Sequence, residues 1–310
     1  MPLYNSLEGI IIIVIMISIG YMLTHIGWFK EEMSDLFSKL VINISLPVMM
    51  FYSFTKTFTR DKLLQTGSSI LIPLFGVGIS YLIGIIISRL LKIKKGRRSL
   101  FTVLFVFSNS IFIGLPVNIA LFGLESVPIV SMYYLVNTTF FWTFGLYSIR
   151  SENSNDENPV ILKKIFTPAL GGFLTAIIVI LININIPEVI TETCEYVGNL
   201  TTPLSMFIMG IILYHLDLSE VEFNREMLFI FIGQFIVTPL LMLFIFNNYF
   251  SIYPLLIKRV FVIEAAMPAM ITIAIVSRAY DADHKYATLM VAATTAASMI
   301  VIPLYMLLLV

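Results

Sequence analysis

The sequence is poor in charged residues and in cysteine. Only 12% of its 310 residues are Asp, Glu, Lys or Arg, and 58% are hydrophobic. Soluble domains carry about 25% charged residues, so this composition excludes an ordinary soluble domain and indicates an integral membrane protein. The single cysteine, Cys194, excludes an internal disulfide and a thiolate metal cluster.

A charge excess and metal-binding motifs are also missing. Nineteen basic and nineteen acidic residues leave no net formal charge, so no nucleic-acid partner is expected. The histidines His25, His215 and His284 are far apart and are expected near helix ends, which argues against a metal cofactor. No His/Glu metal motif, paired intramembrane Asp or Ser/His pair is found at membrane depth, so an enzyme is the least favoured class.

Long apolar runs dominate what is present. A spanning helix needs about 20 mainly apolar residues, and short polar separators leave no room for a soluble domain. The pattern predicts an all-α polytopic membrane protein with ten transmembrane helices, at about residues 7–27, 33–56, 66–91, 99–122, 126–149, 162–184, 188–214, 226–247, 254–279 and 284–310. We predict a first five-helix repeat at 1–150, a cytoplasmic linker at 151–161 and a second repeat at 162–310.

Lys and Arg residues are unevenly divided between alternate loops. One set of loops carries fourteen of them, including the cluster from Arg89 to Arg98, and the other set carries five. Basic loops stay in the cytoplasm. The distribution therefore predicts a multi-pass protein of the cytoplasmic membrane with both termini outside.

The two halves contain matching proline motifs. Residues 43–47, with the sequence NISLP, are similar to residues 199–203, with the sequence NLTTP. Prolines 73 and 116 have counterparts at 239 and 268 at similar offsets. Five helices per half is an odd number, so the second repeat is predicted to be inverted. Inverted repeats with interrupted helices are typical of secondary transporters.

Two polar stretches with prolines lie inside spanning runs, at residues 108–118 and 264–270. Proline lacks a backbone donor and clashes with the preceding turn, so we expect the helices to break and to resume after Pro116 and Pro268. Free N–H groups at the resumed N-termini would favour an anion. Since the centres of the predicted helices lack Arg and Lys, we expect a small mono- or dicarboxylate as substrate.

Glu264 is the most informative residue. A bare carboxylate in the middle of a membrane costs about 2.5–3.5 kcal/mol on insertion scales, so it must be partnered, protonated or bound to a cation. One interpretation is a Na⁺ site formed with Ser108, Asn109 and the carbonyl groups at the helix ends. In a second, Glu264 binds H⁺, since burial disfavours the charged form. A third is a structural carboxyl that joins two helices.

The predicted substrate site contains polar and proline-motif residues of both halves: Asn43, Asn109, Gly114, Pro116, Asn118, Asn199, Thr201, Thr202 and Pro268. For Asn43, Asn199, Thr201 and Thr202, hydrogen bonding between helices is an equally good explanation. Asn118 and Asn137 have weaker cases: Asn137, with Thr138 and Thr139, could contribute to the cation site, but helix packing explains them as well. Gln234 is interpreted as structural.

The order of these motifs resembles the auxin efflux carrier family, which includes plant PIN-type auxin exporters and bacterial malate or malonate permeases. The resemblance covers nearly the whole chain, and the absence of a long central loop is similar to the compact bacterial form. The matching segments are residues 20–23 leading to Leu46-Pro47, 109–116, 167–170, 198–209, 264–268 and Pro303-Leu304.

The resemblance implies the crossover fold of the sodium/bile-acid symporters. Helices 1, 2, 6 and 7 would form a scaffold, and helices 3–5 and 8–10 a mobile transport domain in which helices 4 and 9 cross. It also implies a homodimer in membrane lipid and elevator-like movement of an organic anion, by symport or uniport. Two alternatives remain: a sodium symporter for a larger amphipathic acid, and a membrane sensor that binds without transport.

Overall fold

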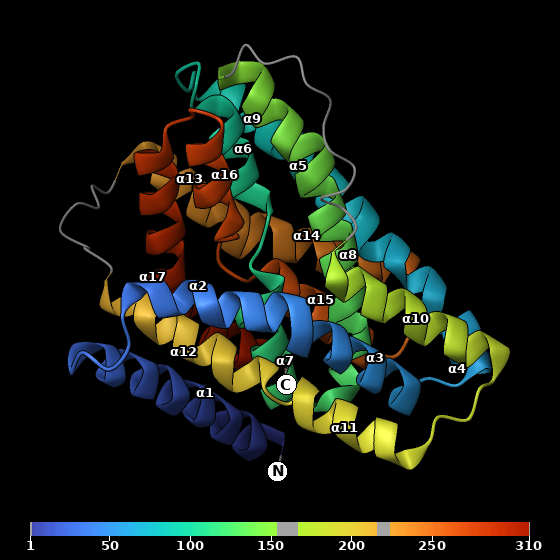
Figure 1. Ribbon diagram of the computed structural model, residues 1–310. Coiled ribbons are helices and arrows are strands. Elements are labelled where there is room, and N and C mark those ends of the chain that lie inside the picture. Colours follow the sequence, from blue (N-terminus) through green and yellow to red (C-terminus); the bar gives the residue numbers. More distant parts are fainter. Residues whose placement is uncertain (1, 154–166, 216–223, 310) are drawn as a thin grey trace.

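The computed structural model describes residues 2–153, 167–215 and 224–309 (Figure 1). In these ranges all regular elements are helical, which confirms the predicted all-α class. The predicted linker at 151–161 falls mainly outside the described residues.

The helices of the first half follow each other with short connections. They are α1 (Pro2–His25), α2 (Glu31–Leu40), α3 (Leu46–Thr57), α4 (Arg60–Thr66), α5 (Leu71–Leu90), α6 (Arg98–Val106), α7 (Leu115–Phe122), α8 (Val127–Phe140) and α9 (Leu146–Asn153). The second half contains α10 (Pro168–Ile182), α11 (Glu188–Gly198), α12 (Thr201–Tyr214), α13 (Arg225–Ile232), α14 (Thr238–Tyr249), α15 (Leu255–Ala265), α16 (Thr272–Ala279) and α17 (His284–Leu309).

Many of these elements follow each other without a break and form longer continuous helices, here called rods. Among the described residues, five rods are long and apolar enough to cross a membrane: Glu31–Thr57, Arg60–Leu90, Glu188–Tyr214, Arg225–Tyr249 and His284–Tyr305. Large apolar side chains also face outward, including Ile11 on α1, Leu82 on α5 and Phe244 on α14. Lipid explains such exposure better than water, and the protein is a multi-pass membrane protein.

Wide π-helical turns precede prolines in three rods. The turns are η1 (Val41–Ser45), η3 (Ser110–Gly114) and η8 (Gly233–Val237), and the second residue of the following α-helix is proline each time. Proline cannot donate to the carbonyl four residues earlier and clashes with it. A turn with i to i+5 spacing relieves this conflict without ending the helix.

The expected break at Pro116 is therefore wrong. Pro116 lies inside a continuous helical rod that begins at Ser110. The break precedes this rod: residues 107–109, here called the first interruption, separate α6 from η3. The second interruption, residues 266–271, separates α15 from α16 and contains Pro268 as expected.

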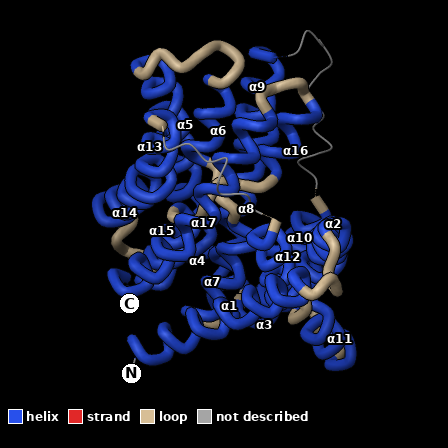
Figure 2. Tube along the Cα trace, turned by 90° about the vertical axis from the view of Figure 1, so that its left-hand side faces the viewer, coloured by secondary structure: helices blue, strands red, loops and turns tan. Residues whose placement is uncertain are grey.

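The helices gather into two groups. In one group, α1 and α2 contact α12, while α3 contacts α10 and α11. In the other, α5 contacts α6, α8 and α14, and α14 contacts α15. Figure 2 shows α2, α10, α11 and α12 together on one side, away from α5, α6, α13 and α14.

Close approach at glycines holds the first group together. A Cβ atom added at Gly210 of α12 would lie 2.4 Å from the carbonyl oxygen of Ile17 on α1. A Cβ atom at Gly172 of α10 would lie 2.1 Å from the carbonyl oxygen of Pro47. Small residues allow membrane helices to pack backbone against backbone, where dispersion contacts replace the hydrophobic effect.

An ion pair joins two loops at one end of the second group. The Nε atom of Arg97, between α5 and α6, lies 2.6 Å from a carboxylate oxygen of Asp283, between α16 and α17. Partial burial raises the pKa of the Asp283 carboxyl, but the Tyr286 N–H and the Arg97 guanidinium lower it further, so the pKa lies below its ordinary value.

Candidate functional site

The two interruptions pair with each other through backbone hydrogen bonds. The N–H of Asn109 donates to the carbonyl of Pro268 at 2.8 Å, and the N–H of Met270 donates to the carbonyl of Phe107 at 2.9 Å. Together they form an isolated antiparallel bridge. Broken backbone is tolerated in a membrane protein when protein groups satisfy it. The two polar stretches identified in the sequence therefore meet in space.

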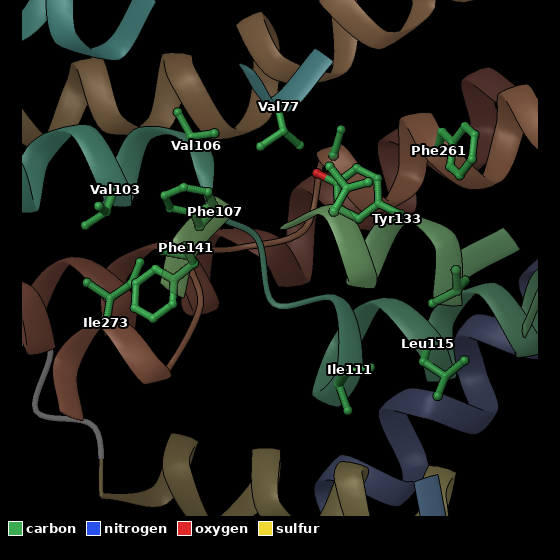
Figure 3. Close-up of a cluster of buried hydrophobic side chains, with 14 of the residues drawn as sticks. Val77, Val103, Val106, Phe107, Ile111, Leu115, Tyr133, Phe141, Phe261 and Ile273 are labelled. Carbon is green, nitrogen blue, oxygen red and sulfur yellow. The ribbon is translucent and has the colours of Figure 1, made fainter. Parts of the chain in front are cut away.

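Aromatic rings enclose the first interruption. Figure 3 shows Phe107 against Phe141, and their ring centroids are 5.6 Å apart. The ring of Tyr133 lies toward Phe261, at 6.4 Å between centroids. Because these side chains are buried, they keep lipid away from the polar backbone of the interruption.

The side chain of Asn109 is held at one end and unpaired at the other. Its Oδ1 accepts from the N–H of Phe112 at 3.2 Å, which caps the start of η3. Its Nδ2 has no hydrogen-bond partner within the described residues, although the residue is only 3% exposed. A buried amide donor without a partner is costly and marks a position where a ligand can bind.

Asn109 also lines a cavity of about 460 Å³. Its walls bring together amide and hydroxyl groups, three aromatic rings and aliphatic side chains, and none of the lining residues is charged. The lining residues are Ile42, Leu46, Asn109, Ser110, Ile111, Phe112, Tyr134, Thr138, Trp142, Thr167, Pro168, Met270, Ile271, Thr272 and Ile275.

The start of α16 borders the same cavity. Ile271 and Thr272 line it, and Thr272 is the first residue of the helix. The N–H groups of Ile273 and Ala274 already donate to the carbonyls of Met270 and Ile271, but the start of the helix still carries partial positive charge. The cavity is therefore lined by the residue that carries the unpaired amide and by the start of a helix, and both groups favour a carboxylate.

Glu264 on α15 is fully buried and does not line this cavity. Its Oε1 accepts from Asn118 Nδ2 at 2.7 Å, and the same Nδ2 also donates to the carbonyl of Gly114 at 2.9 Å. The Ser110 hydroxyl lies near the carboxyl group. Oε2 has no hydrogen-bond partner, and no basic side chain of the described residues forms an ion pair with Glu264.

Gly114 makes room for this carboxyl group. A Cβ atom added at Gly114 would lie 2.5 Å from Oε1 and 2.6 Å from Oε2 of Glu264. The sequence reasoning placed Gly114 and Asn118 with the substrate, whereas the structure places both against Glu264. Ser108, predicted as a cation ligand, donates to the Tyr133 hydroxyl at 3.3 Å, and no hydrogen bond is found between Asn109 and Glu264 in the described chain.

The predicted residues on the scaffold side do not line the cavity. Asn43 is exposed, and its Nδ2 donates to the carbonyl of Lys39 in its own rod, while its neighbour Ile42 lines the cavity instead. Asn199 is exposed between α11 and α12, Thr202 is half-buried, and Thr201 is fully buried with an unpaired hydroxyl.

Sequence reasoning missed several wall residues. Tyr134, Trp142 and Thr272 line the cavity but attracted no attention, since isolated aromatic and hydroxyl residues are common in membrane helices. Thr167 had a usable signal: its position before Pro168 is typical of a helix N-cap, and its hydroxyl does accept from the N–H of Leu170.

Adding a methyl group at Gly114 should displace the Glu264 carboxyl. We expect Gly114→Ala to break the bond from Asn118 and to lower the free energy of unfolding by about 1–3 kcal/mol, because a buried polar group loses its partner. Gly171→Ala on α10 is the matched control, since no atom lies within 4 Å of the added Cβ. Equal melting temperatures for the two purified variants would contradict this packing.

The fold and site together define a polytopic membrane protein with a mainly apolar cavity bordered by its interrupted helices. The family described as "Membrane transport protein" matches residues 6–306. The chain therefore belongs to this family, the auxin efflux carrier family that its motifs resemble. It is a family of membrane transporters and not of enzymes.

Similar proteins are found in archaea. An uncharacterized transporter of Methanocaldococcus jannaschii is 28% identical over 308 residues, which cover 96% of this chain and 97% of the relative. An uncharacterized transporter of Methanothermobacter thermautotrophicus is 26% identical over 306 residues, which cover 97% of each protein. These similarities extend along the whole transporter and name no substrate.

Proposed function

We propose that this protein is a secondary transporter that moves a small organic acid anion across the cytoplasmic membrane, coupled to H⁺ or Na⁺ bound at Glu264. The observation that carries the proposal is the 460 Å³ cavity, which is lined both by Asn109, whose amide Nδ2 is unpaired, and by Thr272, the first residue of α16. A carboxylate placed between them accepts from both without any Arg or Lys.

The lining of the cavity favours one carboxylate on an apolar body. Phe112, Tyr134 and Trp142 supply aromatic walls, and the lining contains no cation to neutralise a second carboxylate. A dicarboxylate such as malate would have to be protonated at one end or compensated by the coupling ion. This observation also supports the second candidate function, symport of a larger amphipathic acid.

The arrangement of the helices supports alternating access of the elevator type. We propose ten transmembrane helices in two inverted repeats, in which the rods containing α6 and α15 cross at their paired interruptions. The group formed by α1–α3 and α10–α12 would be the scaffold, and the other helices the transport domain. Dimerisation through the scaffold and external termini belong to the same proposal.

Uptake into proteoliposomes tests the function directly. The purified protein should accumulate a labelled monocarboxylate, chosen from a panel by its effect on melting temperature, and uptake should saturate. An imposed pH gradient and an imposed Na⁺ gradient are applied separately to identify the coupling ion. Saturable binding with no flux under either gradient would instead indicate a membrane sensor.

A further inference from the structure

Gln234 joins helix α13 to the end of α6. It is fully buried in the π-helical turn η8, and its Nε2 donates to the carbonyl of Leu104 at 2.9 Å and to that of Phe107 at 3.1 Å. Gly233 permits this reach, because an added Cβ there would lie 2.3 Å from the ring of Phe105 on α6. The amide therefore caps two carbonyls where α6 stops.

A second amide caps the next carbonyl along the chain. The Nδ2 of Asn137 on α8 donates to the carbonyl of Ser108 at 2.9 Å. Both amides are fully buried, and the oxygen atom of each, Oε1 of Gln234 and Oδ1 of Asn137, has no hydrogen-bond partner in the described residues. Each side chain thus has a buried oxygen without a partner, while its nitrogen donates to backbone carbonyls at or just after the end of α6.

Carbonyls at the C-terminal end of an interrupted helix carry partial negative charge. In other transporters such groups coordinate a cation. Here neutral N–H donors occupy that place at α6. The structure assigns to Gln234 the role of a positioning residue that replaces a cation at the end of α6 and, through Phe107, holds the backbone that presents Asn109 to the cavity.

Gln234→Glu is the sharpest test, since it keeps the shape but replaces the donor by a carboxylate. Four oxygen atoms would then converge where two carbonyls met an amide, and the site should require a cation or a proton. In K⁺ at pH 8 the melting temperature of the variant should fall. Adding Na⁺, or lowering the pH to 5, should raise the melting temperature of the variant. This rise should exceed by at least about 2 °C the rise that the same change causes in the unchanged protein.

Two further variants keep this test decisive. Gln65→Glu makes the same replacement at an exposed position on α4 and should respond to Na⁺ and pH like the unchanged protein. Asn137→Asp replaces the amide that donates to the Ser108 carbonyl by a carboxylate. The melting temperature of this variant should gain the same response to Na⁺ and pH, even when Gln234→Glu does not fold. The assignment is overturned when neither buried variant gains a response to Na⁺ or pH beyond that of Gln65→Glu.

A transport measurement tests the effect on Asn109, and only this part rests on the proposed function. In K⁺, Gln234→Glu should raise the KM for the acid about tenfold or more with a smaller effect on the maximal rate, and Na⁺ should reverse the change. This size follows from loss of a buried hydrogen bond, since about 1.4 kcal/mol corresponds to a factor of ten. An unaltered KM in K⁺ would overturn the proposed effect of Gln234 on the position of Asn109. The melting experiment can still be interpreted when the protein transports nothing.

Discussion

Replacing Asn109 with Asp should reduce acid uptake at subsaturating concentration by about 100-fold or more. The substitution preserves shape, and its carboxylate can still accept from the N–H of Phe112. The unpaired Nδ2 donor, however, becomes a carboxylate oxygen with negative charge, on a residue that lines the cavity. Loss of a hydrogen bond to a charged group costs about 1.5–3 kcal/mol, and repulsion of the anion adds to this cost.

Initial uptake rates in proteoliposomes measure this effect, with thermal stability as a check on folding. Asn43→Asp is the matched control, because Asn43 is exposed and its amide bonds to its own rod. It should retain uptake within about twofold, because Asn43 does not line the cavity. If Asn43→Asp abolished uptake and Asn109→Asp did not, the binding site would lie on the scaffold face and not at the interruptions.

Glu264→Gln should remove the dependence of transport on the coupling ion. Glutamine retains an oxygen that can accept from Asn118 Nδ2, so the packing against Gly114 survives. It can neither release a proton nor supply a negative charge to Na⁺. We expect gradient-driven accumulation of the acid to be lost, while exchange of labelled for unlabelled acid continues, because exchange needs no net movement of the ion.

The comparison of accumulation with exchange separates coupling from folding. Glu192→Gln, at an exposed position on α11, is the control and should leave both activities unchanged. If Glu264→Gln preserved ion-driven accumulation and only lowered the melting temperature, the carboxyl would be structural. Its role would then be to join α15 to α7 through Asn118.

The interrupted helices show how far sequence patterns predict local structure. Pro268 lies in an interruption as predicted, but Pro116 does not, because the π-helical turn η3 accommodates it. A proline identifies a conflict between its ring and one carbonyl. Whether the chain resolves that conflict by a wider turn or by a break depends on neighbouring segments. Here the break moved to residues 107–109, where the second interruption supplies backbone partners.

The polar residues also show how far the sequence alone can predict the site. The sequence identified Asn109 and Glu264 as candidates, because each is costly inside a membrane without a function or a partner. It could not show that Asn118 would bond to Glu264 from 146 positions away, or that Asn109 would line a cavity. Asn43 looked equally suitable, but its side chain bonds to the preceding turn of its own rod. The sequence interpreted Gln234 as structural, which agrees with its two bonds to backbone carbonyls, but only the structure placed those carbonyls at the end of α6.

By itself, the sequence determined that this protein is helical, resides in a membrane and carries polar, proline-containing stretches inside spanning segments. Those properties follow from composition and run length, since hydrocarbon requires each spanning segment to satisfy its own backbone. Only the tertiary structure decided which helix ends meet, which amides remain unpaired and where space remains for a ligand. Those features depend on contacts between residues far apart in the chain, which no local pattern encodes.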